Sequence, residues 1–566
     1  MSHRYLYALL DHVNINEFLT NSVKRIYNQS YASLVVDKYI SESKIYILGG
    51  IKQGCALSMF GYTLGIEELV VNIHENMNIN GYKIPRMILR SENNNDNDSM
   101  DNNNINNSEM NEIKATMYAD DTGGIVRNLK SIEYFFKEFN NWGKVSGASM
   151  NEDKTKILAI NSSYNRFRNI NFAKELKILG ITFNKEGIDK INLESCKKKI
   201  ENTLNLWDGL RFNMIDKVTV IRTFGLSKLW YLLNFITLEE HEIKNIETLS
   251  FRYIWGNKVE TIKRVALIND FKDGGLNMIS IRAKINTIMI RNLLYIKLNM
   301  YRPQYQFSIY WMKFYFKEYL KNFNILPMGL EKYRPKIYSR MIEDSKKFTI
   351  KFSGWINIEN ERRKKIYDLK VKKISNKDQI KPFTPYSNNF LINSGLLGSK
   401  LIYKLFLTDH SEVKNLDHSI SKSDQEYIFS KIHRILNSSK IRVTNFKLIH
   451  HGLSTNSKFK NRYNNCCFMC KKTLNENSEH IFVKCELAEK FFDFIKNAYL
   501  DKKELKNSLV LLKFKRDVTE RDYKILSCYV YCVWRVRNEC KHGRDVDPFE
   551  IFKILFNKWF ISITNI

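Results

Sequence analysis

The sequence predicts an α+β protein that has short strands in its first third and long helices near its middle. Alternating apolar and polar residues surround a compact polar centre at residues 118–121, which is the pattern of a β-hairpin with acids near its turn. Apolar residues at roughly helical spacing follow a glycine-bounded turn at residues 50–58, so an amphipathic helix is expected there. No proline occurs between Pro85 and Pro303, which permits long helices between about residues 195 and 300.

Other segments extend this reading along the chain. Residues 1–30 are predicted to be helical, and residues 34–48 to form a hairpin that leads into the turn before the amphipathic helix. Residues 93–107 are rich in asparagine and have almost no apolar content. Such a segment cannot bury enough surface to offset its ordering entropy, so we expect a disordered surface insertion. Residues 301–455 are rich in lysine and tyrosine and contain no recognisable motif.

Composition favours a polyanionic partner. The 566 residues include 90 lysines and arginines against 60 aspartates and glutamates, a formal charge of +30, and 13% aromatic residues could supply stacking surfaces. No apolar run approaches the roughly 18 residues that span a bilayer, and residues 1–20 show no signal peptide. Nine cysteines without a secretory signal indicate reduced thiols and metal binding rather than disulfides. We expect an intracellular, nuclear protein that binds nucleic acid and no membrane.

Asp120 and Asp121 are the first candidate metal ligands. Adjacent carboxylates repel each other, so a turn that carries both is either fully solvated or holds a cation. Upstream, the run GIKQGCALS places Gln53, which both donates and accepts hydrogen bonds, beside Gly54, which allows a ligand or another backbone to approach closely. Taken alone, this second segment is equally a plain strand-to-helix turn.

The two segments in this order resemble the RQGCPLS and YADD motifs of reverse transcriptases, specifically those of non-LTR (LINE-type) retrotransposons. The resemblance covers residues 1 to about 300 and returns near the C-terminus. Further stretches resemble other segments of the family in the same order. Residues 146–155 resemble its SGLxxNxxKT segment, and residues 176–181 resemble its YLG primer-grip strand. Residues 226–231 resemble part of its thumb, and residues 255–256 and 274–277 resemble its FLWG and GGLGL stretches.

The resemblance implies an incomplete right-hand polymerase. Residues 1–190 would be a partial palm of antiparallel strands and two packed helices, and residues 191–300 a thumb-like helical region. Residues 301–455 would be a basic connecting region without an assigned role. Residues 456–566 would be a mostly helical, zinc-bearing C-terminal region.

The resemblance also implies RNA-directed DNA polymerisation by two-metal phosphoryl transfer, with an RNA template, a DNA primer or target and dNTPs as partners. Asp120 would be the principal ligand of Mg²⁺ or Mn²⁺, with Asp121 a nearby weaker or structural acid. Tyr118 would lie under the primer end, or be a packing residue of the hairpin. Lys154 would meet the charge of the departing phosphate, or be an exposed turn lysine.

Two further pairs of residues are assigned by the same resemblance. Gln53 and Gly54 would line the template and nucleotide pocket. Leu179 and Gly180 would brace the primer against the thumb, although a strand–Gly–strand corner needs no function.

The second candidate metal centre is near the C-terminus. Cys467 and Cys470 form a CxxC pair, and His480 and Cys485 follow in an HxxxxC arrangement. Two thiolates at this spacing can share one tetrahedral ion through a tight knuckle, and a histidine and a cysteine on a following helix could complete the site. Four ligands without an open position would make Zn²⁺ structural; the alternative is ordinary buried cysteines beside a surface histidine. The segment also resembles the zinc-binding segment after the thumb of many LINE-type reverse transcriptases.

The other cysteines of this region have a different expected role. Cys466 could replace Cys467 with a shift of one residue. Cys528, Cys532, Cys540 and His542 are interleaved with apolar residues, so they are expected to belong to the core rather than to a second metal site.

One departure from the family concerns catalysis. Asp120 and Asp121 alone cannot bridge two ions, and in this family a further aspartate comes from a DxxKAFD-like segment that has no match in these 566 residues. We therefore expect an N-terminally truncated reverse transcriptase that polymerises poorly or not at all by itself. The alternative is a non-catalytic, zinc-containing nucleic-acid-binding remnant. Ala56 and Met59, where the family usually has proline, are smaller departures.

Overall fold

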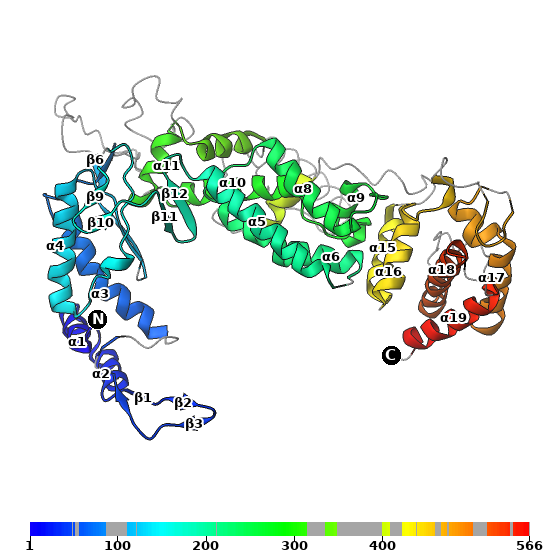
Figure 1. Ribbon diagram of the computed structural model, residues 1–566, viewed down its shortest axis with the longest axis horizontal. Coiled ribbons are helices and arrows are strands. Elements are labelled where there is room, and N and C mark those ends of the chain that lie inside the picture. Colours follow the sequence, from blue (N-terminus) through cyan, green and yellow to red (C-terminus); the bar gives the residue numbers. More distant parts are fainter. Residues whose placement is uncertain are drawn as a thin grey trace, which may run out of the picture. The chain divides into compact units, whose positions relative to one another are not determined.

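The computed structural model describes sixteen stretches of the chain (Figure 1): residues 1–47, 49–50, 56–85, 110–119, 121–162, 164–210, 212–300, 302–313, 334–347, 399–407, 422–436, 438–458, 466–472, 475–501, 518–543 and 547–564. Gln53, Gly54, Asp120 and the asparagine-rich segment 93–107 lie outside these stretches. Contacts divide the chain into two compact units, one of Met1–Asn192 with Tyr295–Ile342 and the other of Leu193–Leu294 with Glu343–Ile566.

Four helices frame the first unit. They are α1 (His3–His12), α2 (Glu17–Tyr27), α3 (Ala56–Glu75) and α4 (Leu129–Ser146). Side-chain oxygens cap three of them at their N-termini, from Ser2 for α1, Asn16 for α2 and Asn128 for α4. α3 and α4 pack against each other around buried Trp142, whose indole N–H donates to the Tyr5 hydroxyl at 3.2 Å and the Gly65 carbonyl at 3.1 Å.

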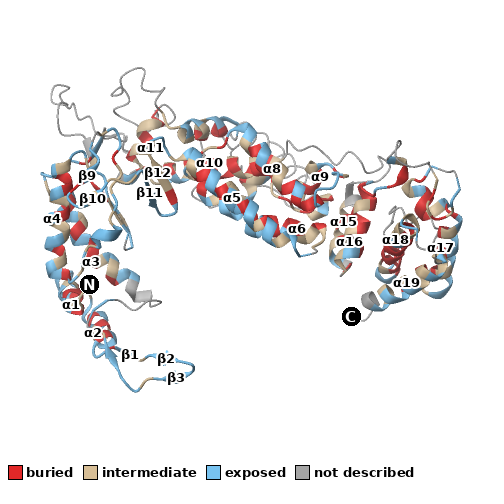
Figure 2. Ribbon diagram, viewed as in Figure 1, coloured by how far each residue is buried: buried red, intermediate tan, exposed pale blue. Residues whose placement is uncertain are grey.

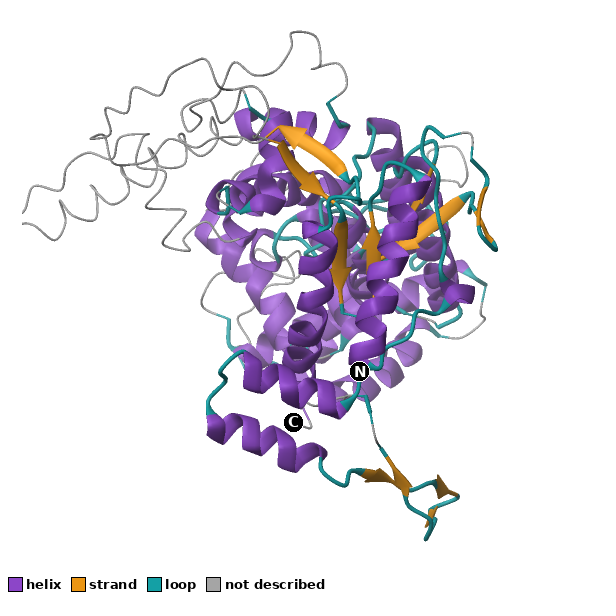
Figure 3. Cartoon of the chain, turned by 90° about the vertical axis from the view of Figure 1, so that its left-hand side faces the viewer, coloured by secondary structure: helices purple, strands orange, loops and turns teal. Residues whose placement is uncertain are grey.

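Short antiparallel pairs make up all the sheet structure of the described residues, and Figure 3 shows these strands among the helices. The pair formed by β7 (Ala115–Tyr118) and β8 (Asp121–Gly124) carries the acidic turn, and β7 packs on α3. The pairs are β1 (Tyr31–Ala32) with β4 (Ile45–Tyr46), β2 (Val35–Val36) with β3 (Tyr39–Ile40), β5 (Tyr82–Pro85) with β6 (Met110–Ile113), β7 (Ala115–Tyr118) with β8 (Asp121–Gly124), β9 (Arg166–Phe167) with β10 (Ile170–Asn171), and β11 (Glu175–Ile178) with β12 (Ile181–Asn184).

The hairpin expected over residues 34–48 is present as two nested pairs. β2 and β3 are joined by Asp37 and Lys38, whose φ values of 47° and 73° are both positive, as in the tight turns that match strand twist. β1 and β4 then close the outer pair. Residues 295–342 also return to this unit, because α11 (Gln306–Trp311) packs on β5 with the Phe307 and Tyr82 rings 6.3 Å apart.

The second unit is helical in its described residues. The long helices expected near residues 195–300 are present. They are α5 (Asp189–Asp208), α8 (Glu240–Trp255) and α10 (Ile281–Leu298). Shorter elements lie between them: α6 (Met214–Val220), the π-helical turn η2 (Ile221–Gly225), α7 (Ser227–Leu232), α9 (Arg264–Ile268) and the 3₁₀ turn η3 (Phe271–Asp273). α5 and α10 each extend across the boundary between the two units.

Helices from the segment without recognisable motifs pack on this group. α14 (Ser399–Leu407) shares a core with α10 through Ile402, Ala283 and Ile290, and the Tyr403 hydroxyl accepts from the Ser280 amide at 2.9 Å. α15 (Lys422–Ile435) contacts η3, and His450, which follows α16 (Ser439–Ile449), reaches the Gly274 carbonyl. Part of residues 301–455 thus completes the core over residues 264–294.

The C-terminal core surrounds α18 (Glu520–Lys541), which is buried along most of its length (Figure 2). α16, α17 (Glu486–Ala498), α19 (Pro548–Thr564) and the π-helical turn η11 (His480–Lys484) all contact it. The buried Tyr529 hydroxyl donates to the Phe482 and Ala488 carbonyls at 3.2 and 2.9 Å, which ties α18 to η11 and α17. None of the described helices is long and apolar enough to cross a membrane.

Acid should weaken the second unit through two buried histidines. Burial lowers the pKa of His433 and of His450 to about 4, from an ordinary value of 6.5. Their neutral rings pack against Phe446. Because the unfolded chain takes up these protons below pH 6.5, the stability held by the neutral rings is present above pH 6.5 and is lost as the pH falls toward 4. We expect a loss of about 1–2 kcal/mol per histidine between pH 7 and 5, measured by urea denaturation. His433→Phe should reduce the loss, and an unreduced loss would contradict this assignment.

Candidate functional site

The acidic turn joins β7 and β8 through two residues. In the register of this hairpin Tyr118 faces Asp121, so Ala119 and Asp120 form the turn, of which Asp120 lies outside the described residues. Ala119 has a φ of 52°, in the left-handed region that costs a residue with a Cβ about 1 kcal/mol or more. The turn is therefore strained at Ala119, and Asp121 lies directly after it at the start of β8.

Alternation along β7 separates a core face from a solvent face. Ala115 is buried and Met117 packs against the core between α3 and α4, whereas Thr116 and Tyr118 are exposed. Tyr118 is 66% exposed, so its ring is not a core residue of the hairpin. Asp121 is also exposed, and its carboxylate is open to a solvated cation or to a substrate.

The other expected polymerase residues lie on exposed turns. Lys154 ends the 3₁₀ turn η1 (Glu152–Lys154), and its amide donates to Asn151 Oδ1 at 3.1 Å while its side chain is in solvent. Leu179 and Gly180 form the turn between β11 and β12, with φ values of 46° and 85°, and Leu179 is 44% exposed. The structure does not describe Gln53 or Gly54.

Comparison with known proteins decides what this hairpin belongs to. Residues 8–183 match the family described as reverse transcriptase (RNA-dependent DNA polymerase), and this segment includes Tyr118, Asp121 and Lys154. Residues 8–183 are a reverse transcriptase domain. The chain is also 22% identical over 305 residues to the "Transposon TX1 uncharacterized 149 kDa protein" of Xenopus laevis. The resemblance of this chain to LINE-type reverse transcriptases is therefore confirmed. That match covers 52% of the chain and 21% of the Xenopus protein, so the chain spans about a fifth of its relative.

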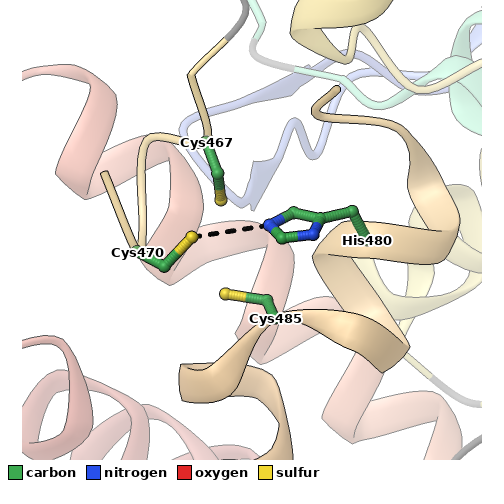
Figure 4. A group of neighbouring side chains, drawn as sticks. All are labelled: Cys467, Cys470, His480 and Cys485. Atoms are coloured by element: carbon green, nitrogen blue, oxygen red, sulfur yellow. Dashed lines mark hydrogen bonds between the residues drawn. The ribbon is translucent and has the colours of Figure 1, made fainter. Parts of the chain in front are cut away.

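A second cluster of reactive side chains lies in the C-terminal core (Figure 4). Cys467, Cys470, His480 and Cys485 point toward a common centre, and one donor atom from each lies within 4.8 Å of all the others. Cys470 Sγ and His480 Nε2 are 3.5 Å apart. The structure thus brings together the four residues that sequence spacing selected. Cys466 is outside the group, which places Cys467 rather than its neighbour in the CxxC pair.

Local backbone geometry positions each of these four side chains. A tight knuckle holds Cys467 and Cys470, with the Lys471 amide donating to the Cys467 carbonyl at 2.8 Å and the Cys467 amide to the Lys472 carbonyl at 3.1 Å. His480 opens the π-helical turn η11, and its amide donates to Asn477 Oδ1 at 2.8 Å. Cys485 is the N-cap of α17.

The environment of Cys485 favours a thiolate. Its hydrogen bond with Cys467 lowers the pKa of Cys485 to about 5 and raises that of Cys467, because the shared proton resides on Cys467. Amide N–H groups of Leu487 and Ala488, at the start of α17, also donate to the Cys485 sulfur and lower its pKa. Because metals bind cysteine as the thiolate, the lowered pKa of Cys485 favours metal binding at this position.

A buried ion pair supports the knuckle, and sequence reasoning did not identify it. Glu476 and Arg537 are 0% and 2% exposed and form a salt bridge. Glu476 Oε2 accepts from the amide of Phe468, which lies between Cys467 and Cys470, at 3.0 Å, and Oε1 accepts from the Asn456 amide at 3.0 Å. The Arg537 guanidinium lies 4.7 Å from the centre of the Phe468 ring. Arg537 of α18 therefore holds the Glu476 carboxylate, and this carboxylate holds the backbone of the knuckle.

Replacing Glu476 should destabilise this region strongly. Glu476→Gln leaves the Arg537 guanidinium buried without a counter-charge, so we expect a loss of about 3–5 kcal/mol in the free energy of unfolding of the second unit. Urea denaturation of the full chain measures it. Glu479→Gln is the matched control, because exposed Glu479 pairs with Lys484 only at the surface, where an ion pair contributes at most about 1 kcal/mol. Equal effects of the two substitutions would contradict the role given to the buried pair.

Of the remaining cysteines of this region, two are core residues and one lies partly buried against the same core. Cys528 and Cys532 are fully buried on α18 with their sulfurs 4.0 Å apart, as the apolar sequence around them predicted. Cys540 is half-buried against the same core, and His542 is exposed at the end of the helix. Within the described residues they join no cluster of metal-ligating side chains.

Proposed function

We propose that this chain belongs to the RNA-directed DNA polymerase of a non-LTR retrotransposon, that it polymerises weakly or not at all by itself, and that the turn of β7–β8 lies at the catalytic site. The observation that supports the proposal most is the position of Asp121. It is exposed next to a turn that is strained at Ala119, within residues 8–183, and it faces the exposed Tyr118 across the hairpin. The formal charge of +30 suits an RNA template and a DNA primer or target.

The residues around the turn have distinct roles in this proposal. Asp120 and Asp121 would hold Mg²⁺ or Mn²⁺, which supplies positive charge where the primer oxygen attacks and pyrophosphate leaves. The exposed Tyr118 ring offers an apolar surface to the last primer nucleotide. Lys154 would meet the departing phosphate charge, and Leu179 and Gly180, with Gln53 and Gly54, would contact primer and template.

The test is extension of a DNA primer on an RNA template by the purified chain with dNTPs, in the presence of Mg²⁺ or Mn²⁺ and with chelator as control. Polymerisation requires a further carboxylate besides Asp120 and Asp121, because two neighbouring acids cannot bridge two ions. We therefore expect the 566-residue chain to be weakly active or inactive, and a version with an added DxxKAFD-like segment to be active. Full activity of the unextended chain would contradict this requirement, and inactivity of both versions would contradict the proposal.

We further propose that Cys467, Cys470, His480 and Cys485 hold one structural Zn²⁺. Three thiols and an imidazole are the donor set of many closed zinc sites, and four protein ligands leave no position for a substrate. The site is enclosed, because Cys467, His480 and Cys485 are all buried. Elemental analysis of the purified chain should find about one zinc ion per molecule.

A second candidate function is nucleic-acid binding without catalysis. It is favoured by the sequence, because no DxxKAFD-like segment occurs within these 566 residues to supply the further carboxylate. Salt-sensitive RNA binding and retained zinc, with no primer extension in either version, would support this candidate over the polymerase.

A further inference from the structure

Lys114 is a buried cation that the proposed chemistry does not use. Its side chain is 4% exposed and immediately precedes β7. The ammonium donates to the His74 carbonyl at 2.8 Å and to the Asn76 carbonyl at 2.9 Å, and Glu112 Oε2 lies 3.7 Å away. These carbonyls belong to the C-terminal end of α3, where helix carbonyls have no helical partner and the helix dipole favours a positive charge.

The acidic hairpin is closed at its base and is attached there to the segment that follows α3. The Ile125 amide donates to the Lys114 carbonyl at 2.8 Å, and the Arg127 amide donates to the Asn80 carbonyl at 2.9 Å. A Cβ at Gly81 would lie 2.3 Å from the Ile113 carbonyl oxygen, so this close approach requires glycine. The Gly81 amide in turn donates to Glu112 Oε1 at 2.8 Å.

The distance along the strand excludes direct participation in chemistry. β7 separates Lys114 from the turn, and a strand rises by about 3.3 Å per residue, so the ammonium lies on the order of 15 Å from the acids. Any influence of Lys114 on the acids must pass through the hairpin backbone.

We propose that Lys114 is a positioning residue for the acidic turn. Its ammonium fastens the base of β7–β8 to the end of α3 and thereby fixes where Asp121 lies relative to that helix. α3 packs against both α4 and β7, so a hairpin that is fastened to α3 is held in place against the helical core. The inference rests on the proposed function in taking Asp121 as a metal-binding acid.

Hydrogen exchange in the full chain tests the first half of the proposal. Lys114→Met removes the donors and keeps most of the volume, so amides of β7–β8 should exchange at least about tenfold faster, while those of α4 change little. Lys114→Arg, which keeps a charged donor, should restore part of the protection. Lys130→Met, at an exposed lysine of α4, is the control. Unchanged exchange in Lys114→Met, or equal acceleration throughout the first unit, would overturn the proposal.

Mn²⁺ binding to the same variants tests the second half. We expect Lys114→Met to weaken Mn²⁺ binding about tenfold at a concentration where the protein is fully folded, and to add nothing in an Asp121→Asn background, because both changes act on one site. If Lys114→Met binds Mn²⁺ as tightly as the wild-type chain does, Lys114 only stabilises the fold, and the positioning role is overturned. If Asp120→Asn, at the principal ligand, leaves Mn²⁺ binding unchanged, the proposed metal site fails, whereas hydrogen exchange still decides whether Lys114 fastens the hairpin.

Discussion

Cys485→Ser should abolish zinc binding and loosen the C-terminal core. A serine hydroxyl is a poor substitute for the thiolate, so the site would keep three ligands and lose much of the roughly 10–16 kcal/mol that structural zinc contributes in small zinc-binding peptides. Cys485 is fully buried at the junction of η11 and α17, both of which contact α18. The loss of zinc should therefore spread to the packing around Tyr529 and Phe482.

Cys466→Ser is the matched control for this prediction. Cys466 is adjacent to the knuckle and half-buried, yet its sulfur is outside the cluster. Zinc content by elemental analysis and protease resistance of the C-terminal region should stay at wild-type values in this variant and fall in Cys485→Ser. Zinc retained by Cys485→Ser, or lost by Cys466→Ser, would contradict the assigned ligand set.

Asp120→Asn should lower primer extension by about 10²–10³-fold or more in the version of the chain that carries the added DxxKAFD-like segment. The amide keeps the size of the side chain but removes the negative charge that holds a divalent ion against the reacting phosphate. Asp121→Asn should have a smaller effect, because Asp121 is the weaker or structural acid of the pair. The rate of single-nucleotide addition at saturating dNTP measures both effects.

Asp153→Asn provides the control for a change of charge near the palm surface. Asp153 is an exposed acid of η1, next to Lys154. It should leave nucleotide addition within about twofold of the wild-type rate, as expected for an exposed surface charge. An equally inactive Asp153→Asn variant would show that the loss in Asp120→Asn reflects a general change in charge and not a specific ligand.

Local patterns predicted the parts of the two sites that are close in sequence. The CxxC and HxxxxC spacings selected Cys467, Cys470, His480 and Cys485, and the structure brings their donor atoms together. Alternation around Tyr118 predicted the acidic hairpin, because one face of β7 is buried and the other is exposed. In both cases the residues are close in sequence and lie on one hairpin or on short consecutive elements.

Contacts between distant residues could not be predicted in this way. Glu476 and Arg537 are 61 residues apart, and a charged pair leaves no periodic signal in the sequence. Lys114 bonds to main-chain carbonyls about 40 residues earlier, which any residue type supplies. The hairpin over residues 34–48 was predicted, but the position of its tight turn was not, because Asp37 and Lys38 adopt positive φ values without the glycine that usually marks them.

The most direct test of the central claim is RNA-templated primer extension by two proteins in parallel, the 566-residue chain and the same chain with a DxxKAFD-like segment added before Met1. We predict divalent-metal-dependent DNA synthesis by the extended chain, little or none by the unextended one, and loss of synthesis on Asp120→Asn. An extended chain that binds RNA and zinc but adds no nucleotide would contradict the polymerase assignment and leave nucleic-acid binding as the function.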